Sequence, residues 1–180
     1  CFTEGFTCHF RELFETTMTV CLVGMDEGMA EKLPECCVNL IRYLGEKHSL
    51  VFTIGASRCY DAVEHITTAA FEASQAVREY FVRGTQQLIC YEELNQNLMH
   101  DNPLAFLTNF KSETSAQRAE LIRAFIAYLT DNRVPSLLAK SYCNYAVQRL
   151  LELNPAHVSV SDLFSVSYLS TIERYETLML

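Results

Sequence analysis

The spacing of hydrophobic residues changes near residue 94, and this change constrains the fold more than any other feature of the chain. Before it, short runs of β-branched and aromatic residues alternate with stretches whose apolar residues have the helical period. After it, every patterned stretch has the helical period. We therefore expect two domains, an α/β domain at residues 1–94 and an α-helical subdomain at residues 95–180.

The first domain is predicted to contain strands and helices in the order β-β-α-β-α-β. Its strands are expected at residues 6–13, 18–23, 50–54 and 87–91. The first helix should begin near Met29 and close at Gly45, and Pro34 should either lie in its first turns or kink it. This order favours an α+β fold, with a mainly antiparallel sheet and helices on one face.

The second predicted helix should begin at Asp61, with Glu64 as its capping-box partner, and end at a glycine C-cap, Gly84. One face of this helix has the apolar spacing of a buried stripe. Its members are Val63, Ile66, Ala70, Ala73, Val77 and either Tyr80 or Phe81.

The spacing of apolar residues in the second half of the chain predicts only helices. Three of these helices are short. These short helices are expected at residues 104–110, 159–169 and 170–180. Ser170 and Glu173 should cap the last of them, while Thr114 and Gln117 form a capping box for a longer helix. Another long helix should have Pro135 in its first turn.

The helix after Pro135 carries an apolar stripe whose members recur at helical spacing. They are Leu138, Tyr142, Ala146, Leu150 and Leu153. The sequence leaves open whether the stripe formed by Leu138, Tyr142 and Ala146 is intramolecular core or a dimer contact.

The chain is acidic, because 14 Lys and Arg stand against 22 Asp and Glu, a net charge of −8. Nucleic-acid binding depends on clustered cations that neutralise phosphates, so this charge argues against direct DNA binding. No apolar run approaches the ~20 residues that span a bilayer, and no signal-peptide pattern opens the chain. We expect a cytoplasmic protein. It begins with Cys1 rather than Met, which suggests a piece of something longer.

The eight cysteines are expected to be small buried side chains in a reducing compartment rather than disulfides or zinc ligands. Cys21, Cys90 and Cys143 stand in apolar or aromatic surroundings. The neighbours Cys36 and Cys37 should point to different sides of a helix, and the chain has no C-x-x-C pair.

Residues 51–57, VFTIGAS, run from a predicted strand into Gly-Ala-Ser, an ending that invites a catalytic interpretation. Both glycine-rich phosphate-binding patterns are absent, however. The nucleophile elbow G-x-S-x-G fails as well, because Cys59 stands where the second glycine belongs. We interpret the stretch as a strand end followed by a small-residue turn. Gly55 should give backbone room, and Ser57 should make a local hydrogen bond or help to cap the next segment.

The remaining candidates for chemistry are scattered. No two histidines have the helical spacing of a metal site; they are His9, His48, His65, His100 and His157. A thiol–imidazole pair of Cys59 with His65 is the less favoured interpretation of those two residues. The acidic pairs Glu92-Glu93 and Asp26-Glu27 lie near strand ends, where solvated termini are the commoner explanation. We therefore assign no catalytic, cofactor-binding or metal-binding residue.

Three sequence blocks carry a resemblance to a known family: LVFTIGAS, then AAFEASQAV, then FVRGTQQLICYEE. Together they resemble the C-terminal half of GGDEF domains, and above all the degenerate GGDEF-like domains of large bacterial transcriptional regulators. The segment Phe71-Glu72-Ala73-Ser74-Gln75-Ala76 is similar to their Tyr/Phe-x-Glu-Ala-x-x-Ala pattern. The blocks LIRAFIAYLTDN, LLAKSYCNYAVQRLLELN and STIERYETLML resemble the segment that precedes the helix-turn-helix pair in AraC-type regulators.

The resemblance implies a truncated GGDEF-like domain followed by a helical connector, in a response-regulator or membrane-sensor type of AraC-type protein. A sensor or receiver domain would precede it, DNA-binding helices would follow it, and the chain would self-associate as a homodimer. Active diguanylate cyclases carry Gly-Gly-Asp/Glu-Glu-Phe where this chain has Glu15-Thr16-Thr17-Met18, without either glycine. The implied role is therefore signal transmission without catalysis. The alternatives are a nucleotide-binding or cyclase-like domain and a module that senses a small metabolite.

Overall fold

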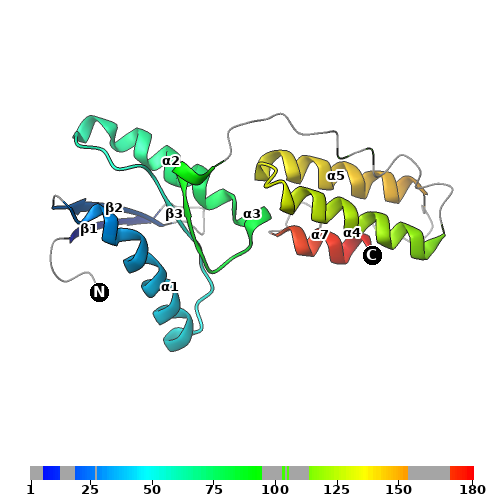
Figure 1. Cartoon of the computed structure of the whole chain (residues 1–180), viewed down its shortest axis with the longest axis horizontal. Helices are drawn as coiled ribbons and strands as arrows, with labels where there is room; N and C mark the ends of the chain where they lie inside the picture. Colours follow the sequence, from blue (N-terminus) through cyan, green and yellow to red (C-terminus); the bar gives the residue numbers. More distant parts are fainter. Residues whose placement is uncertain are drawn as a thin grey trace. The chain divides into compact units, whose positions relative to one another are not determined.

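The computed structural model describes residues 6–12, 19–26, 28–94, 103, 105, 114–153 and 171–180. The chain divides into two compact units (Figure 1). The first comprises Cys1–Val77 with Thr85–Leu94, and the second comprises Arg78–Gly84 with Asn95–Leu180. Arg78–Gly84, which we expected within the first domain, thus belongs to the helical unit.

The first unit opens with an antiparallel hairpin. Strand β1, Phe6–Glu12, pairs with β2, Thr19–Met25, so that Phe6 lies opposite Met25 and Glu12 lies opposite Thr19. The strands predicted at residues 6–13 and 18–23 are confirmed to within two residues at each end. They form where runs rich in β-branched and aromatic residues favour extended backbone.

A second pair of strands is parallel. Strand β3, Ile54–Ala56, pairs with β4, Leu88–Cys90, and helix α2 lies between them in the chain. The expectation of one mainly antiparallel sheet is wrong for the described residues, which form two two-stranded sheets of opposite kinds. A long helical crossover returns the chain in the same direction, which makes the second pair parallel. The mixture of helix and strand is confirmed.

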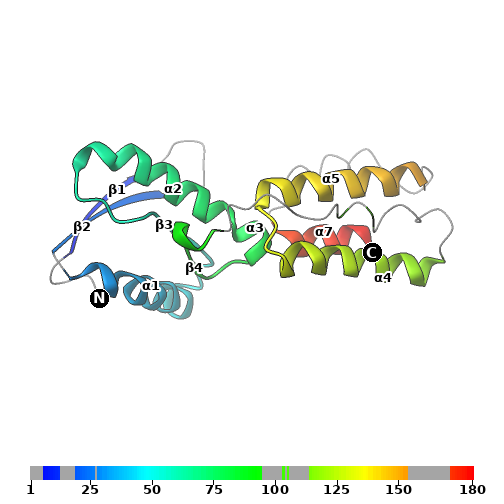
Figure 2. The same ribbon diagram turned by 45° about the horizontal axis from the view of Figure 1, so that its top comes forward.

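The two helices of the first unit flank its strands. Figures 1 and 2 show α1 and α2 on opposite sides of the strands rather than together on one side. Helix α1, Leu33–His48, follows the short 3₁₀ helix η1, Ala30–Lys32, and holds Pro34 in its first turn as predicted. It does not close at Gly45. It continues to Ser49, whose φ of 53° supplies the left-handed C-cap and whose N–H donates to the Gly45 carbonyl at 3.0 Å.

The second helical segment of this unit begins later than predicted. The 3₁₀ helix η2, Val63–His65, leads into α2, Ile66–Arg78. The N-cap of η2 is Ala62, which makes no side-chain cap, so the predicted Asp61 capping box is wrong. Helix α3, Tyr80–Arg83, then ends at Gly84, whose φ of 88° and N–H bond to the Tyr80 carbonyl confirm the predicted glycine C-cap.

The predicted apolar face of α2 is only partly buried. Of its predicted members, Phe81 is buried, and Ala70, Ala73 and Val77 are half-buried. Val63 is 78% exposed, and Ile66 is exposed as well. Helix α2 contacts β3 around Ala73 and Val77. The apolar spacing extends toward the N-terminus beyond this contact, where β3 no longer covers it.

Together with α3, three helices form most of the described part of the second unit: α4, Ser115–Asp131, α5, Ser136–Leu153, and α7, Ile172–Met179. The capping box of α4 is confirmed: the Gln117 N–H donates to Thr114 Oγ1, and the Thr114 N–H donates to Gln117 Oε1. Helix α5 begins directly after Pro135, whose carbonyl accepts from the Ala139 N–H at 2.9 Å.

The remaining short helices are described in part. The N-cap of α7 is Thr171, and Ser170 lies outside the described residues. The helix predicted at residues 159–169 lies outside them too, as do all but one of the residues predicted to form a helix at 104–110. Within the part of the chain that is described, no helix combines the length and apolarity that a membrane crossing requires.

The hydrophobic core of the second unit settles the status of the α5 stripe. Ala146 is fully buried, and Leu138 and Tyr142 pack against the core. The stripe is therefore intramolecular core. The other buried residues of α5, Ala139, Cys143 and Val147, each lie one position after a stripe residue. The core cluster of the unit comprises Phe81, Val82, Ile122, Phe125, Ile126, Leu129, Val134, Ala139, Cys143, Ala146, Val147, Ile172, Tyr175 and Met179.

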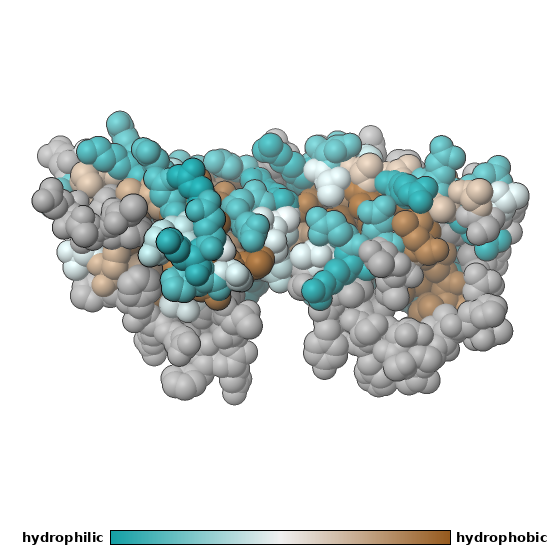
Figure 3. Space-filling view, turned by 90° about the horizontal axis from the view of Figure 1, so that it is seen from below, coloured by the Kyte–Doolittle hydropathy of each residue, from teal (hydrophilic) through white to brown (hydrophobic). Residues whose placement is uncertain are grey.

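Burial of cysteines and other apolar residues is incomplete. Cys37 and Cys143 are buried as expected, but Cys21 and Cys59 are exposed, which corrects the expectation of a uniformly buried set. Figure 3 shows one face of the molecule, on which brown hydrophobic residues reach the surface among teal hydrophilic ones.

Candidate functional site

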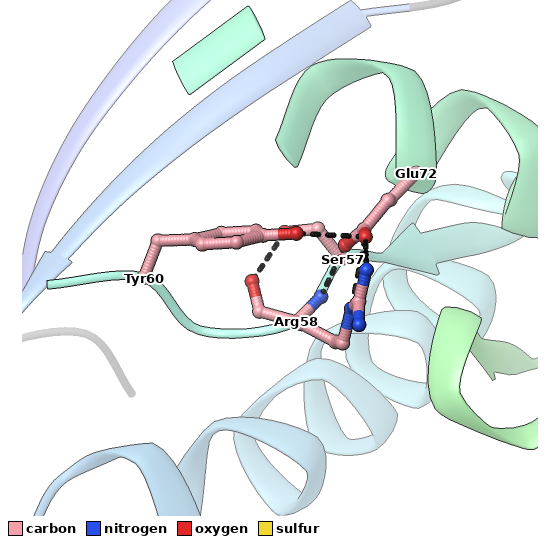
Figure 4. A network of polar contacts seen from close by, with 4 residues as sticks. All are labelled: Ser57, Arg58, Tyr60 and Glu72. Atoms are coloured by element: carbon pink, nitrogen blue, oxygen red, sulfur yellow. Dashed lines mark hydrogen bonds and ion pairs between the residues drawn. The ribbon is translucent and has the colours of Figure 1, made fainter. Parts of the chain in front are cut away.

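The loop after β3 carries a polar network centred on a buried carboxylate of α2 (Figure 4). Glu72 is 2% exposed. Its Oε2 accepts from the Arg58 backbone N–H at 3.1 Å, and its Oε1 accepts from Arg58 Nε at 2.9 Å and from the Tyr60 hydroxyl at 2.7 Å. Arg58 Nη2 completes the ion pair with Oε1. The carboxylate thus holds both the backbone and the side chain of the loop.

The network fixes the charge of Glu72. Hydrogen bonds from the Arg58 side chain, opposed by burial and assisted by the Tyr60 hydroxyl, lower the pKa of Glu72 to about 2. The hydrogen bond with Glu72 raises the pKa of Arg58, and the hydrogen bond of the Tyr60 hydroxyl with Glu72 raises the pKa of Tyr60. Glu72 is therefore a carboxylate, Arg58 a cation and Tyr60 a neutral phenol at neutral pH.

Aromatic rings surround the guanidinium of Arg58. The guanidinium carbon lies 5.9 Å from the ring centroid of Tyr60 and 5.5 Å from that of Tyr91. His65 stacks on the Tyr60 ring at a centroid distance of 5.0 Å. These contacts leave the Arg58 side chain 52% exposed while fixing its direction.

Gly55, in β3, explains why α2 can lie so close to the strand. A Cβ at this position would stand 2.3 Å from the Ala73 carbonyl oxygen, 2.4 Å from the Val77 backbone nitrogen and 2.8 Å from Val77 Cβ. No side chain fits at these distances, so the predicted need for backbone room at Gly55 is confirmed. This contact and the Glu72 network join α2 to β3 and to the loop that follows it.

The arrangement is suited to holding structure rather than to acid–base chemistry. A carboxylate with a pKa of about 2, already bonded on both oxygens, is a poor general base at neutral pH. The Ser57 hydroxyl donates to the Arg58 carbonyl at 2.9 Å. This is the local hydrogen bond that we predicted, and the alternative helix-cap role of Ser57 is wrong.

The histidines and the thiol considered from the sequence do not converge on a site. His48 ends α1, where its ring meets the edge of Tyr43 at 6.3 Å, and His65 stacks on Tyr60. Cys59 is exposed, and no hydrogen bond between Cys59 and His65 is found among the described residues. The backbone of His9 lies in β1. His100 and His157 fall outside the described part of the chain.

The acidic pairs lie apart from this network. Glu92 and Glu93 are exposed in the 3₁₀ helix η3, Tyr91–Glu93, where they add to the effect of burial in raising the pKa of Cys90. Asp26 is exposed, and Glu27 is outside the described residues. In the ranges that the structure describes, no group of three or more His, Cys, Asp or Glu side chains has the arrangement of a metal site.

Sequence reasoning missed the pairing of Arg58 with Glu72. A signal was present, because Glu72 lies four residues before the buried Ala76 and therefore on the same side of α2. A charged residue on a buried helix face needs a partner of opposite charge. The sequence does not say which cation supplies it.

No protein-family model, no curated protein and no solved structure matches this chain.

Proposed function

We propose that this chain is a non-catalytic, signal-transmitting segment of a cytoplasmic bacterial regulator of the AraC type. In this proposal the first unit is a degenerate GGDEF-like domain that receives a signal from a sensor or receiver domain. The helical unit passes the signal to DNA-binding helices that lie elsewhere in the regulator. The block AAFEASQAV, which carries part of the resemblance, contains Glu72, the centre of the polar network.

One observation carries the proposal: the helical stretch formed by α2 and α3 belongs to both units. The chain passes from the first unit to the second between Val77 and Arg78, inside α2. On the first side, α2 is held by the contact with Gly55 and by the Glu72 network. A stretch anchored in two units is a physical route by which a change in one reaches the other.

On the second side, the same stretch is part of the helical core. Phe81 and Val82 of α3 are buried in that core, and the Phe81 ring meets the edge of Tyr175 at 5.6 Å. The Glu79 carboxylate accepts from the Ser136 N–H at 3.1 and 3.2 Å and from its hydroxyl at 3.0 Å. These contacts hold α3 and the start of α5 together within the helical unit.

The chemistry of the described residues supports a role without catalysis. The buried carboxylate is fully occupied by Arg58 and Tyr60, and Ser57 bonds to the neighbouring backbone. The net charge of −8 opposes direct DNA binding by this chain. DNA recognition is assigned to helices beyond Leu180.

The test has two parts. We expect the coding sequence downstream of Leu180 to encode a helix-turn-helix pair, and a stop codon there would remove the basis for an AraC-type assignment. We also expect the purified chain to convert no GTP in the presence of Mg²⁺. Robust formation of a cyclic dinucleotide would favour the cyclase alternative and overturn the proposal.

The transmission itself is tested in the full-length regulator with a reporter gene. Glu79→Ala should uncouple the reporter from the inducing signal while the protein remains folded and abundant. Thr130→Ala is a matched control, because the Thr130 hydroxyl bonds to the Ile126 and Ala127 carbonyls of its own helix. Equal signalling by the Glu79→Ala variant and the wild type would contradict transmission through α3.

A further inference from the structure

Cysteine thiols from several elements of the first unit lie near one another. Burial, together with the nearby thiols of Cys36, Cys90 and Cys8, raises the pKa of Cys37 in α1 to about 11. Cys8 lies in β1 and Cys90 lies in β4, so segments far apart in the chain bring these side chains together.

Cys8 and Cys21 form a pair across the β1–β2 hairpin. Cys8 lies opposite Val23, and Cys21 lies two residues before Val23 in β2. Residues directly opposite each other share a face of a sheet, and so do residues two apart in one strand. The two cysteines are therefore diagonal neighbours on one face, and their side chains are hydrogen-bonded to each other.

Solvent can reach this pair, because Cys21 is exposed and Cys8 is half-buried. Burial, followed by the charge and the hydrogen bond of Cys8, raises the pKa of Cys21 to about 11. A thiolate at Cys8 would thus oppose ionisation of Cys21, because a like charge at close range disfavours the charged form. A cation between the two sulfurs would remove this opposition and displace the thiol protons.

The diagonal spacing suits a bridging ion better than a disulfide. Diagonal neighbours on antiparallel strands have Cα atoms about 7–8 Å apart, whereas a disulfide spans at most ~7 Å without backbone movement. An ion bonded to each sulfur at about 2.3 Å, the length of a zinc–thiolate bond, holds the sulfurs about 4.6 Å apart instead of the ~2 Å of a disulfide. The pair can therefore bind an ion while the strands keep their register.

The number of available ligands decides which ion fits. A structural zinc ion takes four ligands. In the described part of the chain, no group of three or more His, Cys, Asp or Glu side chains is arranged to hold a metal. Monovalent copper is a soft ion for which thiolates are preferred ligands, and it accepts two of them in a line. The net charge of −8 also favours the approach of a cation.

We propose that Cys8 and Cys21 bind one Cu(I) ion between them. Each thiol gives its proton to water and forms one sulfur–copper bond, and the copper stays monovalent throughout. Cys37, which is buried in α1, is a neighbour of this pair and not a ligand. The inference rests on the hairpin of the first unit and is independent of the regulatory role.

Competition with a chromophoric Cu(I) chelator tests the proposal, using the full chain kept reduced by a non-thiol reductant without oxygen. The wild type should take up one ion per chain and release about two protons. Cys8→Ser and Cys21→Ser should each weaken binding by more than the ~100-fold that losing an indirect partner of a metal ligand costs. X-ray absorption of the copper-loaded wild type should show two sulfur neighbours.

Cys59→Ser is the matched control, because it removes an exposed thiol outside the pair. This variant and Cys37→Ala should bind copper as the wild type does, and circular dichroism checks that every variant is folded. Equal binding by the wild type and both pair variants would mean adventitious copper on surface thiols only and would overturn the proposal. Three or more sulfur neighbours in the wild type would overturn it as well, whatever the folding of the variants.

Discussion

The carboxylate of Glu72 and the guanidinium of Arg58 form an ion pair across 14 residues of chain, with the acid buried and the base half exposed. This asymmetry decides what each partner contributes. The charge of the buried Glu72 carboxylate is stabilised mainly by Arg58, whereas the exposed Arg58 guanidinium is also solvated by water. Removing either one therefore has a different consequence.

Arg58→Ala is expected to destabilise the first unit more than Glu72→Gln does. The first change leaves a buried carboxylate without its main partner, and the loss should stay below that of a fully buried pair because the Arg58 side chain is half exposed. The second keeps an oxygen acceptor and removes the charge. Urea denaturation at neutral pH measures both.

The exposed pair of Arg149 with Glu152 provides the control for this comparison. Arg149→Ala should change the free energy of unfolding by no more than about 0.5 kcal/mol, the usual value of a solvated helix pair. A loss from Arg149→Ala as large as that from Arg58→Ala would show that burial is not what gives the Arg58 pair its strength.

The contribution of Glu72 is expected to disappear in acid. The folded state lowers the pKa of Glu72 from its ordinary value of 4.5 to about 2, so folding is favoured by the ionised form. The contribution is complete above pH 4.5 and is lost as the pH falls toward 2, because the unfolded chain binds the proton first.

The difference in unfolding free energy between the wild type and Glu72→Gln isolates this effect from the titration of other carboxylates. It should be constant between pH 6 and pH 8 and should shrink steadily below pH 4.5. A difference that stays the same down to pH 3 would mean that the pKa of Glu72 is not lowered in the folded chain.

Local patterns predicted the elements whose signals lie within a few residues. The Thr114 capping box, the Gly84 C-cap and the β1–β2 hairpin all depend on neighbours in the sequence or on a short connection. The parallel pairing of β3 with β4 and the partner of Glu72 depend on contacts between distant segments. Propensity and spacing do not contain that information.

The apolar spacing that leads into α2 shows that periodicity can also predict burial where none occurs. It continues without a break through Val63, yet Val63 is exposed because this part of the segment has no neighbour to cover it. Periodicity identifies a face that is able to be buried. Whether the face is buried depends on how far the adjoining strand reaches.

Gly55→Ala is expected to be among the most damaging single changes in the first unit. The added Cβ would lie 2.3 Å from the Ala73 carbonyl oxygen and 2.4 Å from the Val77 nitrogen, so β3 and α2 would have to separate. Overpacking of this kind costs about 1–3 kcal/mol or more. Thermal and urea denaturation of the variant measure the loss.

Gly24→Ala tests whether that loss comes from the close approach rather than from the loss of a glycine. A Cβ at Gly24 would stand 3.7 Å from Thr7 Cβ, an ordinary contact. The free energy of unfolding of this variant should lie within about 1 kcal/mol of the wild type, because alanine fits in the folded strand and restricts the unfolded chain. Equal losses at both glycines would contradict the tight packing of α2 on β3.

Glu79→Ala is expected to destabilise the helical unit by about 1–2 kcal/mol, because it removes the carboxylate that accepts from the backbone N–H at the start of α5. Glu79→Gln keeps an oxygen acceptor and should lose less. Hydrogen exchange reports where the effect falls, and the amides in the first turn of α5 should exchange faster in Glu79→Ala. Protection of those amides equal to that of the wild type, with destabilisation elsewhere, would mean that Glu79 does not hold α5.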